Sequence, residues 1–269
     1  MAAPRRRTRP ARVAWLAIAL LFVFAELGFA QRGNRNFGAA FEPTVNNLRY
    51  DGHFTFARLK YTVGPGGYYY RGEPAWAHGY DTAEVNLDQI LNSLTLLHPR
   101  LEGSDVFAVD DPELEKNPVA YMTEAGYWEM TDAEATALGA YVKKGGFLIF
   151  DDFRAPPRGG GGWEQFAANM KRVLPDATIV PLTPADPIFH DFFDIESFSV
   201  LPQAYDGGAP EILGIYEEND PKKRLMAIIN FNTDVSQFWE FSQSGFFTVS
   251  QSNEAYQLGV NYIIYGLTH

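Results

Sequence analysis

The stretch GGFLIFDDF, residues 145–153, decides the fold of this chain. Its apolar part, residues 147–150, can be buried on both faces, which is typical of a central strand in a parallel sheet. The glycine pair Gly145-Gly146 is suited to closing a preceding helix. Asp151 and Asp152 come directly after the apolar residues. We therefore expect a buried parallel strand that brings two carboxylates to one edge of a sheet.

The segments on either side alternate between helix and strand patterns. Thr131 and Glu134 stand at the spacing of a capping box, which predicts a helix that runs to Lys144. A second amphipathic pattern predicts a helix over 81–97, and Glu84 is interpreted as part of its N-terminal cap. The remaining predicted helices are 163–174 and 252–266, and the remaining strands are 53–63, 105–109, 118–122, 177–181, 212–216 and 225–231.

This alternation is typical of an α/β protein. We expect a three-layer α/β/α sandwich with a mostly parallel central sheet, of the Rossmann or flavodoxin-like kind. The chain has 269 residues, of which 46% are hydrophobic, and this is enough for one core of that type. Residues 51–269 are interpreted as a single domain, and the polar, glycine- and asparagine-rich residues 31–50 as a linker.

Residues 1–30 predict export. A basic start with five arginines up to Arg12 precedes the apolar residues 13–24, and small residues lead up to Ala30, as in a secretory signal peptide. A retained membrane anchor is the alternative, because only Glu26 interrupts residues 14–30. The apolar core is short for a membrane-spanning helix, so cleavage after Ala30 is favoured. We expect a periplasmic or extracellular protein that meets a membrane only if this segment is retained.

Composition excludes several functional classes. The chain has no cysteine, which removes disulfides, cysteine-ligated zinc and thiol nucleophiles. A net charge of −11 has the wrong sign for a nucleic-acid binder, whose affinity comes from neutralising phosphates. The histidines show no metal-ligand spacing, and there is no Gly-x-Ser-x-Gly nucleophile motif. We expect neither a metal nor a cofactor.

The doublet Asp151-Asp152 is the sharpest candidate site, because ligands of open α/β sheets bind beyond the carboxyl ends of the strands. The pair could hold a hard cation or act in acid/base chemistry. The favoured interpretation is that one carboxylate bonds the amides of its own loop while the other faces water. Arg58 and Lys60 share a strand face and could bind an anion or neutralise Asp151, and a structural ion pair is favoured.

A loop rich in aromatic residues follows the first predicted strand and supplies further candidates. It contains Tyr68, Tyr69, Tyr70, Trp76 and Tyr80. Its rings could stack on a saccharide or a protein surface, or could pack over the sheet as a lid, and both interpretations stay open. The candidate ligand-binding residues outside the doublet and the basic pair are Tyr61, Tyr69, Trp76 and Glu84.

Several motifs resemble an uncharacterised bacterial family, the domain-of-unknown-function family four-one-five-nine, over essentially the whole chain after residue 50. They are FARLKY (56–61), PVAYM (118–122), GGFLIFDDF (145–153), RVLPD (172–176), DPIFHDFFDI (186–195) and GVNYIIYGLTH (259–269). Family members often carry a His-Pro pair where this chain has Asp186-Pro187. The scaffold also resembles class I glutamine amidotransferase-like and ThuA-like domains, without the cysteine nucleophile of the former. The resemblance implies an exported α/β domain with possible cell-envelope partners of the BatA or von Willebrand factor A type, and it supplies no known activity.

These observations favour an exported module that binds a ligand or a protein without transforming it. The first alternative is a hydrolase of unrecognised type that acts on a saccharide or another small substrate through Asp151 or Asp152. A structural part of a cell-envelope complex is the third possibility. Convergence of the doublet with Arg58 and Lys60 in an open pocket would favour a ligand site or an enzyme, and a closed, fully bonded cluster would favour a scaffold.

Overall fold

The computed structural model describes residues 43–64, 66–67, 69–70, 72–154, 162–198 and 208–269. Contacts divide the chain into residues 1–39 and 40–269, and all described residues belong to the second unit. The expected signal peptide and most of the expected linker therefore lie outside the described residues. Within the described ranges, no helix is both long and apolar enough to cross a membrane.

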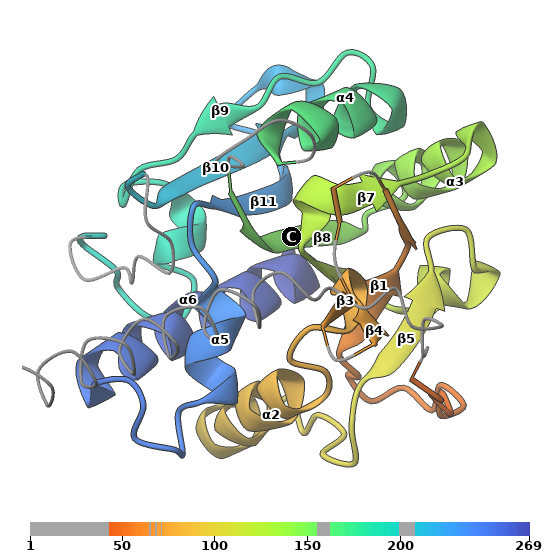
Figure 1. Cartoon of the computed structure of the whole chain (residues 1–269). Coiled ribbons are helices and arrows are strands. Elements are labelled where there is room, and N and C mark those ends of the chain that lie inside the picture. Colours follow the sequence, from red (N-terminus) through yellow and green to blue (C-terminus); the bar gives the residue numbers. More distant parts are fainter. Residues whose placement is uncertain (1–42, 65, 68, 71, 155–161, 199–207) are drawn as a thin grey trace, which may run out of the picture. The chain divides into compact units, whose positions relative to one another are not determined.

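The described residues form a mixed α/β unit around a seven-stranded sheet (Figure 1). Four neighbouring pairs are parallel and two are antiparallel, so the expectation of a mostly parallel sheet is confirmed. In sheet order the strands are β5 (Asp105–Ala108), β1 (Ala57–Lys60), β6 (Val119–Thr123), β8 (Phe147–Phe153), β11 (Leu225–Phe231), β10 (Glu211–Tyr216) and β9 (Val180–Pro181).

Five α-helices accompany this sheet in the described part of the chain. They are α2 (Thr82–Leu94), α3 (Asp132–Lys143), α4 (Trp163–Val173), α5 (Val235–Glu240) and α6 (Val249–Thr268). Two small two-stranded sheets lie outside the main one, β2 (Thr62–Val63) with β7 (Trp128–Glu129) and β3 (Tyr69–Tyr70) with β4 (Glu73–Pro74). The capping box of Thr131 and Glu134 is present as predicted.

The central strand β8 contributes to two separate hydrophobic clusters. Leu148 and Phe150 belong to a cluster that includes apolar residues of α3 and α4. Phe147 and Ile149 belong to another cluster, with residues of α2, α5 and α6. Because successive side chains of a strand point to opposite faces, helices cover both faces of β8. This explains why the sequence is apolar at four successive positions.

The doublet lies inside β8, which continues to Phe153, and not after the strand as expected. Phe150 pairs with Ile229 and Phe153 pairs with Phe231, so two residues of β8 face one residue of β11. This is a β-bulge, and Asp152 has the left-handed φ of 57° that often marks such an extra residue. The bulge allows Phe153 to join the same cluster as Phe150.

Candidate functional site

Three neighbouring parallel strands end side by side at one edge of the sheet, and each carries a strained residue there. Glu124 follows β6, Asp152 lies near the end of β8, and Asn232 follows β11, with φ values of 52°, 57° and 58°. Left-handed conformations of residues other than glycine cost free energy and gather at functional sites. Ligands of open α/β sheets also bind at this carboxyl edge. Both arguments indicate a functional site at the carboxyl edge of β6, β8 and β11.

His78, Asp152 and Asp234 meet at this edge. One ligand atom from each of the three side chains lies within 4.8 Å of the others. His78 Nδ1 is 2.8 Å from Asp152 Oδ2, which also accepts a hydrogen bond of 3.3 Å from Thr123 Oγ1. The His78 side chain is 29% exposed, whereas the carboxyl groups are buried. His78 is therefore the most exposed of the three side chains.

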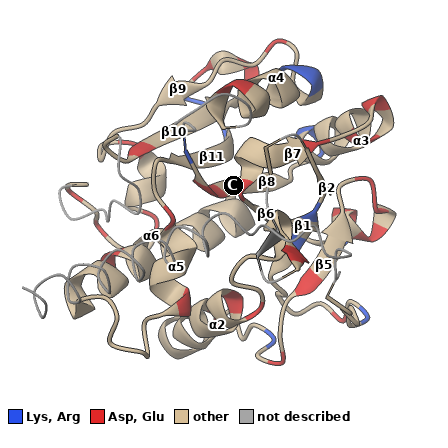
Figure 2. Ribbon diagram, in the orientation of Figure 1, with Lys and Arg blue, Asp and Glu red and all other residues tan. Residues whose placement is uncertain are grey.

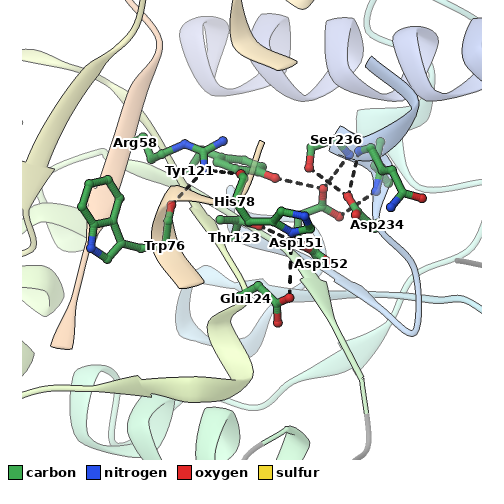
Figure 3. A network of polar contacts seen from close by, with 12 residues as sticks. Arg58, Trp76, His78, Tyr121, Thr123, Glu124, Asp151, Asp152, Asp234 and Ser236 are labelled. Carbon is green, nitrogen blue, oxygen red and sulfur yellow. Dashed lines mark hydrogen bonds and ion pairs between the residues drawn. The ribbon is translucent and has the colours of Figure 1, made fainter. Parts of the chain in front are cut away.

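Glu124 extends this cluster, with Oε1 at 4.0 Å from His78 Nδ1. Asp152 and Glu124 approach the same imidazole nitrogen, Nδ1, from the ends of two adjacent strands (Figure 3). Tyr61 holds this arrangement in place, because its hydroxyl donates hydrogen bonds of 3.0 and 2.9 Å to the carbonyls of Thr123 and Glu124. Tyr61 thus has a positioning role.

Carboxyl groups dominate the electrostatics of the site. The whole chain has 33 acidic and 22 basic residues, and Figure 2 shows the acidic ones spread over most of the drawn elements. Burial raises the pKa of Asp152 well above its usual value, and the nearby Asp234 and Asp151 raise it further. Burial also raises the pKa of Asp234, although His78 opposes this effect. The interaction between the two carboxyl groups raises the pKa of Asp152 and lowers that of Asp234.

Asp151 has a different role from its neighbour. Its Oδ1 accepts hydrogen bonds from Asn230 Nδ2 and the backbone N–H of Val235, at 3.1 and 3.2 Å. Its Oδ2 accepts hydrogen bonds from the backbone N–H of Ser236 and from Tyr121, at 2.9 and 3.1 Å. Burial and the charge of Asp234 raise the pKa of Asp151 to about 7. Asp151 therefore fastens the start of α5 to the sheet.

The structure differs from both parts of the favoured interpretation of the doublet. Asp151 does bond backbone amides, but they belong to α5 and not to its own loop. Asp152 does not face water, since it is 1% exposed and contacts His78. The physical reason is the bulge, which sends the two carboxylates to different partners.

Arg58 forms its ion pair with Glu84 and not with Asp151 as expected. Arg58 Nε donates to Glu84 Oε1, and Nη1 donates to the carbonyls of Trp76 and His78 at 2.8 and 2.7 Å. The cap interpretation of Glu84 is wrong, because this side chain is 1% exposed and turned to Arg58. Among the described residues the preceding Asp81 accepts no capping hydrogen bond either. The buried pair fixes the backbone that carries His78.

Lys60 and Trp76 do not join the cluster. Lys60 is exposed at the end of β1 and lines a separate cavity of about 470 Å³ together with Trp76 and Asp111. Trp76 is only 2% exposed, so its ring is packed in the core and does not form an open stacking platform. Tyr69 lies in the strand β3, and its side chain is outside the described part of the structure.

Sequence reasoning did not select His78 or Asp234. His78 lies in a loop after the 3₁₀ helix Ala75–Ala77, where no periodicity marks it. Asp234 is the N-cap residue of α5, three residues after β11 ends, and its carboxylate accepts a hydrogen bond of 2.8 Å from Gln237 N–H. Ligands of open α/β sheets bind beyond the carboxyl ends of the strands. This rule applies to β11 as well as to β8, and it would have indicated Asp234.

Comparison with family models places the chain. A model with the description "Domain of unknown function (DUF4159)" matches residues 55–267. A comparison with curated proteins finds no match. The matched range contains all of the strands and helices that form the site, including the segments that carry His78, Asp152 and Asp234. Because the match covers most of the sequence, the chain belongs to the DUF4159 family.

Proposed function

We propose that the protein is an exported ligand-binding module whose binding site is the cluster of His78, Asp152 and Asp234. The observation that carries this proposal is the convergence of three ligand-type side chains at the carboxyl edge of the parallel sheet. The partial exposure of His78 gives a ligand access, while the buried carboxyl groups supply charge in a region of low dielectric constant.

Further parts of the proposal concern the context of the domain. We propose cleavage after Ala30, a three-layer flavodoxin-like arrangement of the kind seen in amidotransferase-like and ThuA-like domains, and a place beside cell-envelope proteins of the BatA or von Willebrand factor A type. The apolar clusters on the two faces of β8 support the layered arrangement. The sequence patterns of residues 1–30 support export.

A thermal-shift experiment on the chain from Gln31 tests the binding function. A ligand that binds only the native state raises the melting temperature by mass action, so cations and saccharides should be screened as two panels. We expect at least one stabilising compound, and we expect Asp152→Asn to remove its effect. Asp194→Asn, at an exposed carboxylate outside the site, is the matched control and should keep the effect. A shift that survives Asp152→Asn would place binding elsewhere and contradict the proposal.

A hydrolase is the second candidate function, and one observation favours it. The contact of 2.8 Å between His78 Nδ1 and Asp152 Oδ2 is an imidazole–carboxylate pair of the kind used in general acid/base catalysis. Asp151 does not take part in this version, because donors already occupy both of its oxygens. Chromogenic glycosides and esters test it. Turnover that His78→Gln abolishes would support the hydrolase, and absence of turnover with a ligand that binds would support the module.

A further inference from the structure

The cluster of His78, Asp152 and Asp234 has the donor set of a metal site. It offers one imidazole nitrogen and two carboxylate oxygens, all within 4.8 Å of one another. Zn²⁺ binds such nitrogen and oxygen ligands at about 2.0–2.2 Å, so small side-chain movements would bring all three to one ion. Ca²⁺ and Mg²⁺ prefer sites made of oxygen alone. The donor set therefore favours a transition-type divalent ion.

The site also gathers three buried carboxyl groups. Asp151, Asp152 and Asp234 are 0%, 1% and 2% exposed, and each lies within reach of the charge of another. Arg58, the nearest buried cation, already forms an ion pair with Glu84. Buried carboxylates need a compensating charge or a proton. A bound cation would supply that charge in place of a proton.

Unpartnered buried atoms next to the cluster provide a second, independent observation. Arg58 Nη2 and Glu84 Oε2 are buried and have no hydrogen-bond partner among the described residues. The adjoining Nη1 of Arg58 donates to the carbonyl of His78, which connects this guanidinium with the loop that presents the imidazole. Buried polar atoms are normally satisfied by protein, water or ligand. The orphaned donor thus requires an oxygen acceptor.

Glu240 connects these orphaned atoms with the cluster. A Cβ on Gly79 would lie 3.1 Å from Glu240 Oε2, so this half-buried carboxylate faces the residue after His78. The charges of His78, Arg58 and Glu84 all act on its pKa. The orphaned atoms and the three ligand-type side chains therefore border one polar region.

We propose that His78, Asp152 and Asp234 bind a divalent metal ion, Zn²⁺ or Mn²⁺, and that the module recognises an oxygen-bearing ligand through this ion. The inference rests on the proposed binding function and names its ligand chemistry. Three protein ligands leave at least one coordination position open, as in zinc sites that accept water or a substrate. A hydroxyl or carboxylate oxygen of the ligand would take that position.

Metal titration of the chain from Gln31, after removal of metals with a chelator, tests the inference. We expect one Zn²⁺ or Mn²⁺ per chain by calorimetry and metal analysis, with much weaker binding of Ca²⁺ and Mg²⁺. His78→Gln and Asp152→Asn should each weaken binding by at least about 10-fold, because losing even a residue that only supports a metal ligand costs about 10–100-fold. Asparagine tolerates the left-handed backbone of Asp152, so this variant should fold.

The surface pair of His190 and Asp194 supplies the matched control. Its Nδ1 and Oδ1 atoms are 3.1 Å apart, and the Asp194 side chain is 82% exposed. Asp194→Asn should leave the affinity for the metal unchanged. Metal-free melting curves of all variants show whether they fold. Binding that is absent, or that is equally strong in wild type and Asp152→Asn, would overturn the inference.

The metal inference and the proposed function fail in different ways. If a saccharide stabilises the chelator-treated wild type but not Asp152→Asn, the proposed binding function is supported. The inference that binding requires a metal ion is then contradicted. If the metal binds more weakly to His78→Gln and Asp152→Asn, and ligands bind only to the metal-loaded protein, both the metal inference and the proposed function are supported. A saccharide that stabilises Asp152→Asn as much as the wild type would contradict the proposed function, whatever the metal does.

Discussion

Asp151 and Asp152 are neighbours in the chain but meet different partners, and this separates their contributions to stability. Four donors converge on Asp151, while Asp152 shares its surroundings with other carboxyl groups. In Asp151→Asn one acceptor oxygen becomes an NH₂ group that faces donors. Leaving a buried donor unsatisfied costs about 1–3 kcal/mol, and each Asp151 oxygen accepts from two donors, so we expect this variant to lose at least about that amount of stability in urea unfolding.

Asp152→Asn provides the comparison for that experiment. It removes a buried carboxyl group that shares the site with Asp151 and Asp234, and it keeps the shape of the side chain. We expect the metal-free variant to be as stable as the wild type or more stable. If Asp152→Asn proved the more damaging of the two, the division of roles described here would be wrong.

The buried ion pair of Arg58 and Glu84 gives a second prediction at the level of single residues. Glu84→Ala leaves a fully buried guanidinium without its carboxylate, which typically costs about 3–5 kcal/mol. Glu134→Ala is the control, since Glu134 is only half-buried and belongs to a capping box, worth about 1 kcal/mol. Chemical denaturation measures both. Similar small losses for the two variants would mean that Glu84 is no more than a cap.

Among the elements, β8 is the central strand of the main sheet. Leu148 is 1% exposed and lies between β6 and β11 in the sheet. Truncation of a buried leucine usually costs about 2–5 kcal/mol, and we expect Leu148→Ala to fall in this range. Leu96, which is 90% exposed, is the matched control, and Leu96→Ala should change stability by less than about 0.5 kcal/mol. Equal effects of the two truncations would be incompatible with a central β8.

The elements also show what the sequence can and cannot predict. The long helices and the strands of the sheet were predictable, because apolar periodicity and caps such as Thr131 are local signals. The helix α5 has only six residues, too few for a periodic pattern, so it was missed together with its N-cap Asp234. The bulge in β8 depends on register against β11, and the partner of Arg58 depends on how α2 packs. Both are set by tertiary contacts that local patterns do not contain.

Export is a prediction about the whole chain. The basic start, the apolar stretch and Ala30 together predict removal of residues 1–30. Amino-terminal sequencing of protein from the cell envelope should therefore begin at Gln31. Recovery of the intact chain from Met1 in the membrane fraction would instead support the alternative of a retained anchor.

The stability of the molecule should depend on pH in a direction opposite to that of most acid-sensitive proteins. Glu254 of α6 is buried, and both of its carboxylate oxygens lack a hydrogen-bond partner among the described residues. Burial raises its pKa from 4.5 to about 7. Burial and the charge of Asp234 also raise the pKa of Asp151 to about 7. Between pH 4.5 and about 7 the native state thus holds protons that the unfolded state has released.

Stability falls with rising pH wherever the native state binds more protons than the unfolded state. We therefore expect the metal-free protein to unfold at a lower urea concentration at pH 8 than at pH 5. Glu254→Gln keeps the size of the side chain but cannot ionise, so it should reduce this difference and stabilise the protein chiefly at pH 8. Glu164→Gln, at an exposed carboxylate in the first turn of α4, is the control and should leave the pH dependence unchanged. A Glu254→Gln variant whose stability follows pH as the wild type does would show that Glu254 ionises freely in the folded protein, and its burial in α6 would then not explain the pH dependence.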